Sequence, residues 1–159
     1  MERILALAAL ALASFLNFNT HRADIGVGQD LMAEEIESLG GDLIQSTFEQ
    51  IAALPFDAVA QPDSPSDLTE PAQFGGTASW DAAADLDDLE GATVTRRLQG
   101  ADGGGLDYTL AAEVVYVAKS GGTWREVPQR TYFKMLTLTA TGPGSFAATL
   151  TSVYTAEGQ

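Results

Sequence analysis

The spacing of hydrophobic positions changes three times along the chain, and each change marks a different predicted element. Residues 1–22 are a nearly continuous apolar run. Residues 23–54 carry apolar side chains every three or four positions, residues 55–91 have no regular spacing, and residues 92–159 alternate. Spacings of 3.6 and 2 are those of helix and strand. The pattern predicts an α+β fold in which a long N-terminal helix, apolar in its first half and amphipathic in its second, packs on a C-terminal antiparallel β-sheet.

The first segment, "MERILALAALALASFLNFNTHR", holds no charge between Ile4 and Leu16. As a helix this stretch would span about 20 Å at 1.5 Å per residue, which is short for a bilayer core of about 30 Å. Arg3 ahead of it and "ALA" at 11–13 are typical of a cleaved signal peptide. The alternative is a retained helix, which must enter a membrane or pack against copies of itself.

The second segment has the pattern of an amphipathic helix. Acidic residues fill one face and Pro55 is expected to stop the helix. The apolar positions are Met32, Ile36, Leu39, Leu43, Phe48, Ile51 and Leu54. Two glycine pairs, Gly26 with Gly28 and Gly40 with Gly41, are predicted breaks, because an interior Gly costs about 1 kcal/mol relative to Ala. We expect one helix from about residue 3 to 54, bent or unwound at these glycines.

The remaining chain divides into an acidic Pro/Gly-rich loop, residues 55–91, and a β domain, residues 92–159. Strands are predicted at about 92–99, 107–119, 123–127, 130–141 and 145–155, separated by the turns "ADGGG", "KSGG" and "TGPG". Short turns favour antiparallel pairing. The apolar face of such a sheet needs a cover, and the amphipathic helix is the candidate of the right size.

Composition narrows the class of partner. The net charge is -14, and no Lys or Arg occurs between Arg22 and Arg96. This excess of acid disfavours nucleic acid as a partner, since binding phosphate requires Lys and Arg. The acid-rich, Lys-poor composition fits a well-solvated acidic surface and equally a high-salt environment, where screening weakens self-repulsion. Cysteine is absent, so disulfides and thiol chemistry are excluded.

Candidate chemistry is sparse. The densest group of oxygen ligands is Asp85, Asp87, Asp88 and Glu90, which is either a solvated turn or helix cap, or a Ca²⁺ site. "DLDDLEG" is not the twelve-residue EF-hand loop, which makes the turn the favoured interpretation. The single histidine has no nucleophile beside it, and no Gly-x-Ser-x-Gly motif occurs. The sequence therefore predicts no enzyme and no cofactor, with Ca²⁺ as the one open alternative.

Several stretches, in this order, resemble type IV pilins and their relatives, the pseudopilins and minor pilins. "ILALAALALASFLNFNTHR" followed by "LMAEEIESLGGDLIQSTFEQIAALPFD" is similar to the N-terminal helix of prepilin-type proteins. "SWDAAADLDDLEGATV" is similar to an Asp-rich segment ahead of the sheet in some of them, and "EVVYVAKSGG" with "RTYFKMLTLTAT" resembles their paired closing strands. The resemblance implies a structural subunit that is anchored in the inner membrane before the pilus machinery assembles it. The product would be a homopolymeric filament at the cell surface.

The same resemblance implies roles for particular residues. The bundled core of the filament would be formed by Ile4, Leu5, Leu7, Leu10, Leu12, Phe15, Leu16 and Phe18. Charge pairs between subunits are expected among Glu2, Arg22 and Glu34. Two alternatives remain open: a secreted monomeric β-rich binding module whose signal peptide is removed, and a low-copy minor pilin or pseudopilin of a secretion system.

Overall fold

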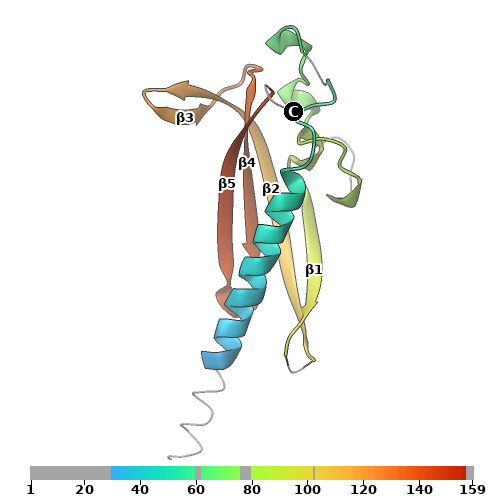
Figure 1. Cartoon of the computed structure of the whole chain (residues 1–159), viewed down its shortest axis with the longest axis vertical. Helices are drawn as coiled ribbons and strands as arrows, with labels where there is room; N and C mark the ends of the chain where they lie inside the picture. The colour runs from blue at the N-terminus through green and yellow to red at the C-terminus, as the bar shows by residue number, and fades with distance from the viewer. Residues whose placement is uncertain (1–29, 60–61, 76–79, 102, 157–159) are drawn as a thin grey trace, which may run out of the picture.

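The computed structural model describes residues 30–59, 62–75, 80–101 and 103–156. A helix over residues 30–51 lies diagonally across one face of a five-stranded sheet (Figure 1). The strands are β1 (Thr93–Gln99), β2 (Gly105–Ser120), β3 (Thr123–Glu126), β4 (Phe133–Thr141) and β5 (Ala147–Thr155). Among the described residues, the first turn of the helix lies at one end, and the C-terminal end of β5 lies at the other.

All strand pairs are antiparallel, and the sheet order is β1-β2-β4-β5, with β3 paired to the far end of β2. The sequence predicts an antiparallel sheet of four or five strands, and the structure has the sheet with five. Its alternation is clearest in β4, where every second residue is buried. The other face carries threonines that pair across strands, such as Thr139 with Thr149. One face is thus apolar and covered, whereas the other is polar.

The helix buries one stripe against the sheet. Ile36, Ile44 and Ile51 line this stripe at helical spacing. Gly40 lies between them, and a Cβ atom at this position would collide with the ring of Phe146. The hydroxyl of Tyr108 on β2 donates a hydrogen bond to the Ile36 carbonyl (2.8 Å). The missing side chain at Gly40 therefore allows the close approach of helix and sheet.

The predicted long helix is wrong as a description of this fold. The described helix is short, covering residues 30–51, and the chain turns over residues 52–54 before Pro55. Gly40 and Gly41 lie inside it without a break, because the packing against Phe146 favours a glycine there. Residues 1–29, with the predicted break at Gly26 and Gly28, lie outside the described residues. No helix in the described part is long and apolar enough to cross a membrane.

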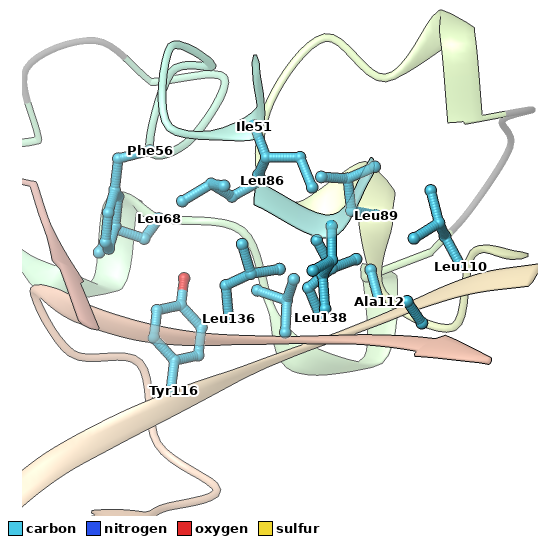
Figure 2. Close-up of a cluster of buried hydrophobic side chains, with 13 residues drawn as sticks. Ile51, Phe56, Leu68, Leu86, Leu89, Leu110, Ala112, Tyr116, Leu136 and Leu138 are labelled. Carbon is cyan, nitrogen blue, oxygen red and sulfur yellow. The ribbon is translucent and has the colours of Figure 1, made fainter. Parts of the chain in front are cut away.

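The predicted acidic loop is a second cover for the sheet. Its described residues contain four short 3-10 helices, η1 (Pro65–Asp67), η2 (Pro71–Gln73), η3 (Trp80–Ala82) and η4 (Asp87–Leu89). Leu68, Leu86 and Leu89 from this segment are buried. Figure 2 shows them facing Leu136 and Leu138 of the sheet. A segment this long without regular structure is unusual unless it is functional or packs on something, and here it closes the core beyond the end of the helix.

Candidate functional site

A lysine lies fully buried on the covered face of the sheet. Lys134 is the second residue of β4 and shares its inward face with Leu136 and Leu138, so the strand alternation directs it into the core. Its side chain is 0% exposed. Nζ donates hydrogen bonds to the Phe56 carbonyl (2.7 Å) and to Asp57 Oδ2 (2.9 Å). Since a buried charge without a partner is very costly, these contacts decide whether the lysine is tolerated.

Asp57 is the first carboxylate of the cluster and is densely hydrogen-bonded. It follows the helix by six residues, and its side chain is 0% exposed. The backbone N–H and hydroxyl of Thr69 both donate to it (3.0 Å each), as does the backbone N–H of Val59 (3.2 Å). Burial by itself raises the pKa of Asp57, but these hydrogen bonds and the nearby Lys134 outweigh it and hold the pKa below its usual value. Asp57 is therefore the ionised member.

Asp87, the first residue of η4, is the second carboxylate and lies in the opposite situation. Its Oδ1 is 2.5 Å from Lys134 Nζ, which is an ion-pair distance. Neither of its oxygens accepts a hydrogen bond of regular geometry within the described part of the chain. Burial raises the pKa of Asp87 to about 7, although Lys134 lowers it, and the neighbouring Asp57 raises it further. Two carboxylates beside one ammonium group thus divide into an ionised and a protonation-prone partner.

Aromatic rings enclose the three groups. Lys134 Nζ lies 4.2 Å from the ring centre of Phe56, 5.2 Å from that of Tyr116 and 5.3 Å from that of Phe74. The Tyr116 hydroxyl donates to the Thr69 carbonyl (2.8 Å), and burial raises the pKa of this hydroxyl. Figure 2 shows the Tyr116 ring rising from the sheet towards the covering segment. The enclosure has a low dielectric constant, so charges inside it interact strongly and neutral forms are favoured.

A cleft of about 540 Å³ borders the cluster. Phe56, Asp57 and Asp85 contribute to its walls, together with the neighbouring residues of both segments. The backbone N–H of Leu86 donates to the Pro55 carbonyl (3.1 Å), which holds these two segments side by side. The cleft gives the buried groups a short path to solvent.

The predicted acidic group is split among separate partners. Asp85 Oδ1 accepts from the backbone N–H groups of Asp87 (3.0 Å) and Asp88 (3.3 Å), while Asp88 Oδ2 accepts from Ala84 (2.8 Å). Glu90 instead accepts from the backbone N–H of Val114. Within the described residues, no group of three or more acidic or histidine side chains is arranged to hold a metal ion. These carboxylates act as caps and turn-fixing groups, and Asp87 alone turns towards the lysine.

The predicted assembly residues between Ile4 and Phe18 lie outside the described residues, as do Glu2 and Arg22. Glu34 is exposed on the helix. Near it, the first turns of the described helix carry two exposed apolar side chains, Leu31 (61% exposed) and Met32 (51%). The predicted burial of Met32 on the helix stripe is therefore wrong, since this side chain is exposed to solvent.

The buried lysine cluster was not predicted from the sequence. The sequence holds one signal for Lys134. In "FKMLTLTA" it lies an even number of positions before the apolar residues Leu136, Leu138 and Ala140. Alternate residues of a strand share a face, so Lys134 is on the inward face with them. No comparable signal exists for its partners, because Asp57 and Asp87 resemble the other acids of a loop rich in them.

Comparisons with known proteins give this chain no relative. No family model, no curated protein and no solved structure matches it. The resemblance to pilins therefore stays a prediction.

Proposed function

We propose that this chain is a structural subunit of an extracellular filament of the type IV pilus kind, assembled by bundling of its N-terminal apolar segments. The observation that carries the proposal is the pair of exposed side chains Leu31 and Met32 at the start of the described helix. Both large apolar groups lie in the first turn of the described helix. Exposed apolar groups gathered at one end favour an interaction surface there.

The sequence continues this apolar character towards the N-terminus. The run from Ile4 to Leu16 carries no charge, and every residue in it except Ser14 is Ile, Leu, Ala or Phe. Burial of such a run contributes on the order of 10 kcal/mol per subunit at about 25 cal/mol per Å² of apolar surface, before the cost of ordering the segment. Self-association through this segment requires no cofactor and no catalysis, and the excess of acid disfavours nucleic acid.

Charge supports a staggered arrangement of copies. Glu34 and Glu37 are exposed on the helix, while Arg22 is a basic residue of the N-terminal region. In bundled copies that are offset along the axis, Arg22 of one subunit can face these acids of a neighbour. Before assembly the apolar segment would hold the subunit in the inner membrane, from which the pilus machinery would extract it to the cell surface.

The test is assembly of full-length protein on cells. We expect Leu10→Asp and Leu12→Asp to abolish the sedimentable polymer in material sheared from cell surfaces, because a carboxylate in the apolar core is strongly disfavoured. The matched control is Val59→Asp, which places the same charge at an exposed apolar side chain outside the proposed interface. Normal filament yield from either N-terminal variant would contradict the proposal.

N-terminal peptide mapping of the sheared material separates the alternatives. Residues 4–18 retained in a polymer support the filament. A soluble chain that begins after the "ALA" at 11–13 would instead favour the secreted β-rich module, since residues 30–156 already contain a buried core. One or a few copies per polymer would favour the minor pilin or pseudopilin.

A further inference from the structure

We propose that Lys134 and Asp87 join in an intramolecular isopeptide bond, with Asp57 as the group that moves the protons. The proposal is independent of the filament function. It rests on an amine and two carboxyl groups held in contact, with Nζ 2.5 Å from Asp87 Oδ1 and 2.9 Å from Asp57 Oδ2. All three side chains are at least nine-tenths buried. Groups in contact and fixed in place react as if at very high concentration.

The roles of the two carboxyl groups follow from their surroundings. An amine attacks a neutral carboxyl group, whereas a carboxylate is a poor electrophile and a good proton acceptor. Asp57 is held ionised by its contacts with Thr69 and Val59. Asp87 has no regular hydrogen bond within the described part of the chain, and the apolar enclosure favours its neutral form. Asp87 is therefore the electrophile and Asp57 is the base.

The reaction balances without any further reagent. Asp57 takes a proton from the Lys134 ammonium group, which leaves a lone pair on Nζ. Nζ attacks Cγ of the protonated Asp87, and the tetrahedral intermediate passes a proton from nitrogen to the hydroxyl group that leaves. The Cγ–O bond breaks, one water departs towards the cleft beside Asp57, and the products are a neutral amide and a protonated Asp57. No oxidant or reductant is involved, and the net charge of the cluster stays zero.

The enclosure favours this outcome over a simple ion pair. Formation of the amide removes the ammonium group and with it the buried ion pair, and low dielectric surroundings favour neutral products. The rings of Phe56, Phe74 and Tyr116 keep bulk water from hydrolysing the product. The bond would tie η4 to β4 and so fasten the covering segment to the sheet.

Mass spectrometry of the denatured full-length chain tests the bond directly. We expect the protein to lose about 18 Da, one water, relative to its sequence. Because N-terminal processing also changes the intact mass, peptides decide the question. Cleavage after glutamate should release residues 50–90 joined to residues 127–157, and fragmentation ahead of Pro71 should leave the linked mass with Asp87. Unlinked peptides would overturn the proposal, and a link to Asp57 would overturn the assigned roles.

Variants separate the chemistry from a structural role. Lys134→Met should abolish the mass loss. Lys119→Met, which changes the other, exposed lysine of the chain, should keep it. Asp57→Asn should leave the chain unlinked, since an amide cannot accept the proton. Asp87→Asn should form the same bond, but with loss of ammonia, about 17 Da, in place of water. Packing alone cannot produce this change in mass. A water loss that survives in Asp57→Asn would contradict the role of the base. The wild-type peptides still decide the matter if a variant fails to fold.

Discussion

At the scale of single residues, the cluster around Lys134 shows how a charge is accommodated in an apolar core. Strand alternation directs the side chain inward, where an isolated ammonium group would be far too costly. One carboxylate neutralises it, and the second carboxyl group is tolerated because it retains its proton up to a pKa of about 7. The cluster therefore combines an ionised and a neutral acid in one enclosure.

Replacing Lys134 with Met should make stability depend on pH in a defined direction. The pKa of Asp87 is raised by burial from 3.8 to about 7, and Lys134 lowers it, so it stays raised in the variant. Between pH 4 and pH 7 the folded variant keeps a proton that the unfolded chain has released. The free energy of unfolding therefore falls as pH rises through this interval, by up to about 4 kcal/mol. Urea unfolding at a series of pH values measures it.

The matched control is the double variant Lys134→Met with Asp87→Asn, which has the same core but no titrating group at position 87. It should lose the decline between pH 4 and pH 7. An equal decline in both variants would show that another group is responsible. Neither variant can form the proposed amide with Lys134, so the measurement is independent of that bond.

The hydroxyl groups of two tyrosines give a matched pair of deletions. The Tyr116 hydroxyl donates to the Thr69 carbonyl, whereas the Tyr154 hydroxyl is buried with no hydrogen-bond partner in the described part of the chain. Tyr116→Phe should lower the free energy of unfolding by about 1–3 kcal/mol, because the partly buried Thr69 carbonyl loses its donor. Tyr154→Phe should be neutral or stabilising. Equal losses in chemical denaturation would contradict this account.

At the scale of elements, the contact between the helix and the sheet depends on one glycine of an adjacent pair. Gly40 faces Phe146 across the interface, while the position of a Cβ at Gly41 is open. Phe146 in turn packs edge-on against Tyr108, with ring centres 5.7 Å apart. The sequence pattern treats both glycines as breaks, but packing retains the helix through them. A tertiary contact here overrides local propensity.

The two glycines should therefore respond oppositely to alanine. Gly41→Ala should raise the free energy of unfolding by up to about 1 kcal/mol, the helix propensity difference. Gly40→Ala has the same propensity gain, but it displaces the Phe146 ring, and overpacking costs about 1–3 kcal/mol. Thermal unfolding of the two variants side by side measures the difference. A Gly40→Ala variant as stable as Gly41→Ala would show that the interface has room to spare.

The sheet could be predicted because its signals are local. "RTYFKMLTLTAT" alternates, and the turns between strands contain glycine. The end of the helix at residue 51 rather than 54 could not be predicted as firmly, since the chain turns there to bring Asp57 under the sheet. The pairing of Lys134 with carboxylates 77 and 47 positions earlier has no local signal at all. Such contacts depend on the complete topology.

At the scale of the whole molecule, two uneven distributions stand out. The two most exposed large apolar side chains of the described residues, Leu31 and Met32, are adjacent in the first turn of the described helix. Negative charge is concentrated on the helix and on the segment 55–91, which together cover the sheet, since no Lys or Arg occurs between Arg22 and Arg96. The first favours association of copies at one end. The negative charge repels copies that approach each other through the helix and the segment 55–91, unless salt screens it.

Replacing the apolar side chains at the start of the helix should weaken self-association without unfolding the chain. Leu31→Ser with Met32→Ser removes exposed apolar groups, so we expect a lower yield of sheared polymer and an unchanged thermal midpoint. Val59→Ser, at an exposed apolar side chain eight residues beyond the other end of the helix, is the control and should keep normal yield. Full yield from the double variant would mean that the helix end lies outside the interface.

Salt should stabilise the folded chain through its net charge of -14. Raising ionic strength from 0.01 M to 1 M shortens the Debye length from about 30 Å to about 3 Å, which weakens repulsion among carboxylates held together by the fold. We expect the free energy of unfolding in urea to increase with NaCl. Changing Glu34, Glu37, Asp42 and Glu49, which are all exposed on the helix, to their amides removes four negative charges and leaves the apolar contacts intact. If this variant kept the full salt dependence, the stabilisation would come from stronger apolar burial in salt rather than from screening of the acidic face.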